Sequence, residues 1–439
     1  MRYLYNLWTN QTKVSLERVS TPFINPAKER ISSFAALKHR NFRVFLTGQF
    51  VSLTGTWVQS IAQSWLLYRL TKSELILGLA SFATHLPMLL LGLAGGVAAD
   101  RFDRRKVVLV TQTLFLVQAT VMAALTLTGV VQVWHVLVLA IFFGIVNAFD
   151  VPARQSLLIH MADRKDLLSA VALNSAAFNS ARAVGPSLGG IAVAAVGEGL
   201  CFAINAVSFL CVLISLSMLR LPLIERSSTG DPMDHLRSGL RYAWGHHEIK
   251  AVLALCGAVT MSIAPMIVLG PFFADQIFHV GSKGLGFLMA AFGVGAVLGT
   301  LTLAHGGVAT ASLPRVAMHN SFGLGLALIA MAFAPNFTAG LIIMLVSGFA
   351  VFRQNAAANT FIQQTVEEEF RGRVLSLYSI MAVGMMPVGS LAAGLLAHQA
   401  GARVTVGVGG VVVLLAATRF FLSEKNKTQS DSPYIRPAL

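Results

Sequence analysis

An arginine in the middle of a long apolar stretch is the residue whose chemistry most needs explaining. Arg182 lies near the centre of the apolar run 168–196. An arginine at the centre of a membrane span costs about 2.5–3.5 kcal/mol on the most lenient insertion scale, so it needs water or a partner. No Asp or Glu falls at the same depth. We therefore expect Arg182 to face an aqueous cavity and bind an anionic or acceptor-rich small molecule. A structural tether to Asp150, or to carbonyls freed by Pro186, is the alternative.

Polar side chains form a stripe on the first apolar run. Glutamine, serine and threonine recur between Gln49 and Gln63 at helical spacing, which places them on one face about 21 Å long. Because lipid offers polar groups no partners, this face should meet water or protein. We expect a cavity wall, and hydrogen bonding between helices of a dry bundle is the alternative. The predicted substrate-binding residues are Gln49, Thr56, Gln59, Gln63, Asn147, Asn179 and Arg182.

Two titratable residues are candidates for carrying a proton. His85 lies in the middle of the second apolar run, and imidazole titrates near physiological pH. Asp150 follows Asn147 by about one helical turn and precedes Arg154 by four residues. A structural role is the alternative for each of them.

A charged turn separates the second and third apolar runs, between Gly95 and Lys106. An aspartate beside an arginine-rich turn can pair with that turn or with a neighbouring helix end, and an exchange of partners would act as a conformational switch. A positively charged cytoplasmic loop without further role is the alternative. The predicted switch residues are Gly96, Asp100, Arg101, Arg104 and Arg105.

The composition is that of a membrane protein. Of the 439 residues, 55% are hydrophobic and 12% are charged, about half the charged share of a soluble domain. The net charge of +14 is spread between apolar runs, which argues against a nucleic-acid partner. All three cysteines fall inside predicted spans, so we expect neither disulfides nor a metal site. The first forty residues lack an apolar core, and we expect no cleavable signal peptide.

Twelve apolar runs predict an all-α fold of twelve transmembrane helices. They begin near Phe42, Leu75, Val107, Trp134, Leu168, Leu200, Ile249, Leu285, Pro314, Phe337, Val374 and Val404. Lysine and arginine are strongly biased to alternate segments, with 28 on the side of the N-terminus and four on the other side. The positive-inside rule therefore places both termini in the cytoplasm.

The chain contains an internal repeat at a constant offset of 204 residues, which pairs Gly144 with Gly348, Gly185 with Gly389 and Gly190 with Gly394. We predict two six-helix pseudo-repeats, an arrangement suited to alternating access. The expected parts are an N-terminal cytoplasmic extension (1–33), an N-terminal bundle (34–219), a cytoplasmic linker (220–248), a C-terminal bundle (249–422) and a cytoplasmic tail (423–439).

Several motifs resemble those of the major facilitator superfamily. The switch residues resemble its loop between spans 2 and 3. The segment 185–190, Gly-Pro-Ser-Leu-Gly-Gly, resembles the span-5 signature of its drug:proton antiporters, although Ala181 stands where a glycine is expected. From Phe34 onward the chain is similar to the branch of enterobactin exporters and macrolide efflux proteins. Further residues that carry this likeness are Asn41-Phe42-Arg43, Gly48-Gln49, Gly55-Thr56-Trp57-x-Gln59, Thr71-x-Ser73 and Asp150-x-Pro152-x-Arg154-Gln155.

The span-5 signature implies a helix-packing gate, because small residues let two helices touch closely. The predicted gate residues are Gly185, Pro186, Gly189 and Gly190, with Gly295 and Gly299 as the matching face across the halves.

The resemblance implies a secondary active transporter of the bacterial inner membrane that exports a siderophore or drug-like molecule by proton exchange. No enzymatic activity is expected, and no cofactor beyond the proton motive force. The expected partners are a small-molecule substrate and membrane lipid, with the chain acting as a monomer. A lipid or lysophospholipid flippase, or an uptake permease of the same fold, is the alternative.

Overall fold

The computed structural model describes residues 34–219, 232–305 and 308–430, and every regular element in these ranges is a helix. The extension 1–33, the linker residues 220–231 and the tail residues 431–439 lie outside the described residues. The N-terminal half contains η1 (Ala35–Lys38), α2 (Arg40–Thr71), α3 (Glu74–Arg101), α4 (Arg104–Leu127), α5 (Val133–Leu158), η2 (Arg164–Asp166) and α6 (Leu167–Ser217).

The C-terminal half repeats this series of long helices with more interruptions. Its elements are α7 (Pro232–Gly245), α8 (His247–Val268), α9 (Gly270–Phe272), η3 (Phe273–Ile277), α10 (Gly281–His305), η4 (Thr310–Ser312), α11 (Leu313–Ala332), α12 (Phe337–Thr365), α13 (Glu368–Ser379), η5 (Ile380–Gly384), α14 (Met386–Ala400) and α15 (Ala402–Ser430). Helix α7 lies in the predicted linker and packs on α13, where the rings of Tyr242 and Phe370 stack 4.5 Å apart. Helix α15 continues into the segment predicted as the tail.

Nine helices in the described ranges are long and apolar enough to cross a membrane. Helix α6 has 51 residues, about twice the length that one crossing requires. It contains a break at Gly197, whose φ of 80° is not helical, so α6 covers two of the predicted apolar runs. Helices α2 and α11 match predicted runs in position but are outside the nine, because polar residues such as the glutamines of α2 lower their hydropathy.

The turn between α3 and α4 is much shorter than predicted. Helix α3 extends to Arg101 and α4 begins at Arg104, so only Phe102 and Asp103 lie between them. The carboxylate of Asp103 accepts hydrogen bonds from the backbone N–H groups of Arg105 and Lys106, at 3.0 and 3.4 Å. This N-cap starts the next helix at once, and most of the predicted hinge 95–106 is helical.

The sequence repeat reappears in the packing. A Cβ atom built on Gly185 would lie 2.5 Å from Cβ of Trp57, and one built on Gly389 would lie 2.7 Å from the carbonyl oxygen of Met261. Trp57 and Met261 are themselves 204 residues apart. The two halves therefore place corresponding glycines against corresponding positions of α2 and α8.

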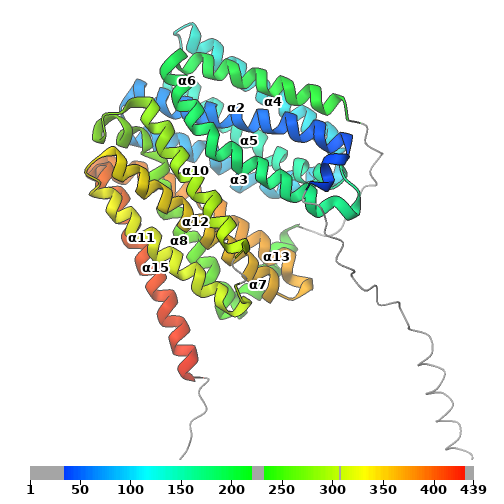
Figure 1. Cartoon of the computed structure of the whole chain (residues 1–439), viewed down its shortest axis with the longest axis vertical. Coiled ribbons are helices and arrows are strands. Elements are labelled where there is room, and N and C mark those ends of the chain that lie inside the picture. The colour runs from blue at the N-terminus through cyan, green and yellow to red at the C-terminus, as the bar shows by residue number, and fades with distance from the viewer. Residues whose placement is uncertain (1–33, 220–231, 306–307, 431–439) are drawn as a thin grey trace, which may run out of the picture.

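The helices of the two halves converge at one end of the molecule and diverge toward the other, on the right of Figure 1 where α7 and α13 lie. Across the halves, α6 packs on α10 and α3 packs on α14. We call the converging end, where α2 ends and α3 begins, the closed end.

Candidate transport pathway

A polar contact joins the two halves at the closed end. The hydroxyl of Tyr68, on α2, donates to Oδ2 of Asp275, on η3, at 2.5 Å, and Nζ of Lys72 lies 3.0 Å from the same oxygen. The ring of Tyr68 also meets Phe272 edge to face at 4.9 Å. These residues were not among the predicted sites. One feature of the sequence could have indicated them: basic residues are scarce on the side of the membrane opposite the N-terminus, where Lys72 is one of four.

Beside this polar contact, pairs of small residues join the two halves, and we call this contact the glycine seam. A Cβ atom built on Gly190 of α6 would lie 2.7 Å from Cα of Gly286 on α10, and one built on Gly78 of α3 would lie 2.7 Å from Cα of Gly394 on α14. Nearby, the hydroxyls of Ser81 and Ser390 are 2.8 Å apart. Backbones of opposite halves therefore touch directly, which only glycine allows at these distances.

The predicted gate residues divide between two neighbours. Gly185 and Gly189 pack on α2, against Trp57 and against Val58 and Ile61 respectively, whereas Gly190 packs on α10. Pro186 joins this second contact, because its carbonyl oxygen would lie 2.7 Å from a Cβ atom built on Gly286.

The prediction that Gly295 and Gly299 form the matching face is wrong. A Cβ atom on either would clash with carbonyl oxygens of α12, those of Leu345 and Phe349, so both glycines serve packing within the C-terminal half. The residues of α10 that meet α6 are Gly286 and Gly293. Residues 293 and 295 differ by about 200° around a helix, so the two pairs of glycines lie on opposite faces.

Arg182 lies on α6 at the boundary between the halves. Its guanidinium carbon is 4.1 Å from the ring centroid of Phe352 on α12 and 5.1 Å from that of Phe178. Nη2 donates to Oδ1 of Asn179 at 3.3 Å, and Nε is buried without a hydrogen-bond partner. No carboxylate of the described residues forms an ion pair with Arg182. The guanidinium is thus held between aromatic rings with hydrogen-bonding capacity left over.

Asp150 is not the partner of Arg182. The alternative that Arg182 is tethered to Asp150 is therefore wrong for the described structure. The carboxylate of Asp150 is fully buried and accepts from Thr111 at 2.7 Å and from Gln112 at 2.9 Å. It also forms an ion pair with Arg154 one turn along α5. This carboxylate therefore lies inside the N-terminal half, between α4 and α5.

Gln59 lies inside the N-terminal bundle, and its prediction as a cavity residue is corrected. Its side chain is only 4% exposed, donates to Gln118 at 3.0 Å and accepts from Asn205 at 2.7 Å. Gln59 therefore forms hydrogen bonds between helices, which was the alternative to its lining a cavity. Gln49 is also buried, at 5% exposure, while Thr56 and Gln63 are partly buried.

The remaining polar candidates make local contacts. Asn147 donates to Sδ of Met88 at 3.6 Å, and Asn179 donates to the carbonyl of Ser175 at 2.9 Å. Nδ1 of His85 lies 2.8 Å from the carbonyl oxygen of Ser81 on its own helix, so the imidazole donates there. His85 and Asp150 are thus separate sites, each with its own partners.

In the predicted switch, the glycine that contacts a neighbouring helix is Gly95, one residue before the predicted Gly96. A Cβ atom on Gly96 would meet nothing within 4 Å, whereas one on Gly95 would lie 1.9 Å from the carbonyl oxygen of Ala148. Gly95, and not the predicted Gly96, therefore permits the close approach of α3 and α5.

The charged members of the switch are divided between exposed and bonded groups. Asp100 and Arg101 are exposed, and Asp100 forms no ion pair with any described residue. Arg104 donates to Nε2 of His160 at 2.5 Å, and Arg105 donates to the carbonyl of Ser217 at 3.0 Å. Partial burial and the positive charge of Arg104 lower the pKa of His160. The imidazole is then neutral at pH 7 and can accept this bond.

Replacing Asp275 with asparagine is expected to loosen the closed end. The change removes the charge that Lys72 and the Tyr68 hydroxyl both bind, which we expect to cost about 1–2 kcal/mol after allowing for its partial exposure. Labelling of a cysteine placed at Ser73 should rise about fivefold to thirtyfold. Unchanged labelling would show that the polar contact does not hold this end.

The same contact predicts a pH dependence. The hydrogen bond from Tyr68 lowers the pKa of Asp275, and Lys72 adds to this effect against partial burial. A lowered pKa means that the contact is present above the ordinary aspartate value of about 3.9 and is lost only as the pH falls through the lowered value. Labelling at Ser73→Cys should therefore be constant between about pH 8 and pH 5, apart from the titration of the thiol itself.

A sequence model of the transmembrane secretion effector family matches residues 31–435 of the chain. The chain belongs to this family, which is part of the major facilitator superfamily. The resemblance inferred from the motifs is thereby confirmed.

Several relatives share most of their length with this family member. It is 23% identical over 401 residues to the staphyloferrin A transporter of Staphylococcus aureus, covering 89% of this chain and 98% of that one. It is 28% identical over 373 residues to the multidrug efflux pump Tap of Mycolicibacterium fortuitum, covering 81% and 90%. It is 25% identical over 407 residues to the enterobactin exporter EntS of Shigella boydii, covering 90% and 96%.

A solved structure shows the same fold. The crystal structure of a bacterial homologue of the human lysosomal transporter Spinster, in an inward-facing and unoccupied conformation, matches with a TM-score of 0.67 at 15% identity. The match covers 89% of this chain and 97% of that one. Family, fold and apolar helices together identify a multi-pass membrane protein whose relatives are transporters.

Proposed function

We propose that this protein is a secondary active transporter that exports a small anionic molecule across the bacterial inner membrane by alternating access. One observation carries the proposal: the two halves touch at the closed end and at Arg182, and their helices diverge toward the opposite end (Figure 1). Two repeated bundles that meet at one end are suited to rocking about a central site. In this proposal the chain crosses the membrane twelve times.

The orientation follows from the basic residues. The positive-inside rule places the termini in the cytoplasm, so the closed end faces the periplasm and the described state opens inward. The likeness to a transporter structure described as inward-facing supports this assignment. An exporter in this state would take its cargo from the cytoplasm.

The cargo class follows from Arg182. A guanidinium with an unpartnered Nε, bordered by Phe178 and Phe352, suits a molecule that combines an anionic group with apolar or aromatic parts. A siderophore is such a molecule, and two of the relatives are named for siderophores. A comparison of extracellular metabolites in cells with and without the gene tests the proposal, because the exported compound should disappear from the medium.

We assign proton coupling to Asp150 in preference to His85. Protonation of Asp150 would remove the charge that binds Arg154 and would rearrange the contact between α4 and α5. Among the described residues, His85 hydrogen-bonds to a carbonyl on its own helix alone, so its titration would disturb less of the bundle.

Asp150 is an ion-paired carboxylate in the described inward-open state, so the proposal requires it to be protonated in the outward-open state. Purified protein in weakly buffered detergent that includes both states should release protons when cargo draws it into the inward-open state. Asp150→Asn should abolish this release, because the amide cannot titrate, while His85→Gln should keep it. A pH-indicating dye provides the measurement, and cargo affinity measured separately shows that each variant still binds. Equal release from the parent and Asp150→Asn would exclude Asp150 as the carrier.

A further inference from the structure

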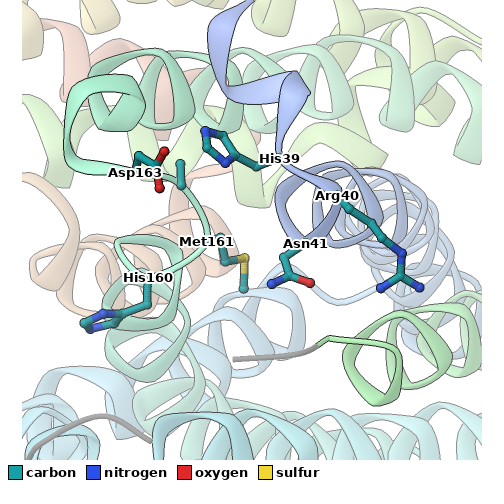
Figure 2. A pocket seen from close by; sticks show the side chains of 7 residues that line it. His39, Arg40, Asn41, His160, Met161 and Asp163 are labelled. Carbon is teal, nitrogen blue, oxygen red and sulfur yellow. The ribbon is translucent and has the colours of Figure 1, made fainter. Parts of the chain in front are cut away.

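Three potential metal ligands meet at the end of the N-terminal half opposite the closed end. The ligand atoms of His39, Asp163 and Asp166 all lie within 4.8 Å of one another. Nε2 of His39 is 2.8 Å from Oδ2 of Asp166. Figure 2 shows the imidazole of His39 extending toward the carboxylate of Asp163. None of these residues was predicted as a site, because His39 lies more than 120 positions before the two aspartates in the sequence.

Each of the three residues lies at the start of a helical element, yet none of their side chains caps its own helix. His39 is the N-cap of α2, Asp163 that of η2 and Asp166 that of α6, and each lacks a side-chain cap hydrogen bond. Aspartate at an N-cap ordinarily accepts from the first turn of its helix. Here the side chains turn toward a common point instead.

The backbone that carries these ligands is firmly held. The N–H group of Ala36, in η1, donates to Oγ of Ser169, near the start of α6, at 3.1 Å. Ala36 is fully buried in a core cluster that also includes Phe42 and Met161. The start of α2 and the loop before α6 are therefore fixed against each other, so the ligands are arranged in advance.

We propose that His39, Asp163 and Asp166 bind one divalent transition-metal ion. Ligands that share an ion at about 2.0–2.2 Å lie about 3–4.4 Å apart. Only small side-chain movements are therefore needed: the pair His39–Asp166, at 2.8 Å, must widen slightly, and any pair near the limit of 4.8 Å must contract. An imidazole with two carboxylates favours ions such as Mn²⁺, Fe²⁺, Co²⁺ or Zn²⁺ over Ca²⁺ and Mg²⁺. On binding, Nε2 of His39 is unprotonated and the three ligands carry two negative charges, which the ion neutralises.

The surroundings leave room for the rest of the coordination shell. His39 and Asp163 border a hollow of about 610 Å³, which Arg40, Asn41 and His160 also line (Figure 2). Water in this hollow can complete the shell. The carboxylate of Asp163 has no hydrogen bond or ion pair with any residue that the structure describes.

Two nearby arginines are engaged elsewhere. Arg40 donates to the carbonyl of Met218 at 3.4 Å, and Arg104 donates to His160 at 2.5 Å. The second contact also removes Nε2 of His160 from the set of ligands. The ion therefore has three protein ligands, all from the N-terminal half, and it would remain bound while the two halves move relative to each other.

Titration of the chelator-stripped, full-length protein in detergent with Mn²⁺ tests the proposal. The electron paramagnetic resonance signal of free Mn²⁺ should stay below that of the same Mn²⁺ added to buffer alone, and the difference should stop growing once one ion is bound per chain. Mn²⁺ should also raise the melting temperature, because it joins the start of α2 to that of α6.

Asp163→Asn should weaken binding at least tenfold and abolish the thermal shift. The side chain is exposed and unpartnered among the described residues, so this variant should fold as the parent does. His39→Gln should have the same effect on affinity, and His398→Gln, which alters an exposed histidine at the far end of α14, should leave it unchanged. Absence of saturable binding in the parent, or equal affinity in Asp163→Asn, would overturn the site.

Discussion

Replacing Arg182 with alanine is expected to abolish transport of an anionic cargo while leaving the protein folded. Within the described residues the arginine holds no carboxylate, so its removal leaves no buried acid unpaired. Removing it also relieves the cost of an arginine inside the membrane. Cargo affinity should fall about tenfold to a hundredfold, the value of a charge-assisted hydrogen bond of about 1.5–3 kcal/mol.

Arg403 provides a matched control for this experiment. Its guanidinium donates to the carbonyls of Ala332 and Ala334 at 2.9 and 3.3 Å, where it fastens the end of α11 to α15. Arg403→Ala should therefore lower the melting temperature and leave cargo affinity unchanged. If Arg182→Ala also lowers the melting temperature and leaves cargo affinity unchanged, Arg182 is a packing residue and the proposed cargo site is wrong. Arg182→Lys should recover part of the affinity, because lysine keeps the charge without the planar fork.

Replacing Gly190 with alanine is expected to force the closed end apart. The new Cβ atom would lie 2.6 Å from the carbonyl oxygen of Ser282 and 2.7 Å from Cα of Gly286. Both are backbone atoms that cannot rotate away, so α6 and α10 must separate. Labelling of Ser73→Cys should rise more than tenfold and transport should fall to a similar extent. Alanine is a better helix former than glycine by about 1 kcal/mol, so the loss cannot come from α6 itself.

Gly92 provides the matched control, because a Cβ atom there would meet nothing within 4 Å. Gly92→Ala should label and transport as the parent does. Gly286→Ala should reproduce Gly190→Ala, because its Cβ atom would lie 2.7 Å from the carbonyl oxygen of Pro186 on the facing helix. Labelling of Gly190→Ala at the level of the parent would contradict a closed end that depends on backbone contact.

The fold was predictable because its main determinants are local or periodic. Apolar runs marked the long helices, and the offset of 204 residues marked the two halves, whose glycines then proved to pack at equivalent places. Arg182 stood out because a single charge in an apolar run is conspicuous at any depth. Its place between the halves could be inferred from that isolation, but its aromatic neighbour Phe352 could not.

Other features depended on information that spacing does not contain. A polar stripe has the same period whether it faces water or another helix, so the contacts of Gln59 with Gln118 and Asn205 could not be distinguished from a cavity wall. The choice between Gly95 and Gly96, or between Gly286 and Gly295, depends on how each helix is rotated about its axis. The contact of Tyr68 with Asp275 joins residues 207 positions apart, a separation that no local pattern reports.

The glycine seam has a kinetic consequence. Where Gly190 meets Gly286 and Gly78 meets Gly394, the two surfaces are smooth, so they can part and meet again without any side chain changing its rotamer. Interlocked leucines or phenylalanines would have to disengage one by one, and each would add to the activation barrier. A seam of bare backbone instead loses only weak dispersion contacts, which suits the proposed alternating access, in which the same two surfaces would separate in each cycle.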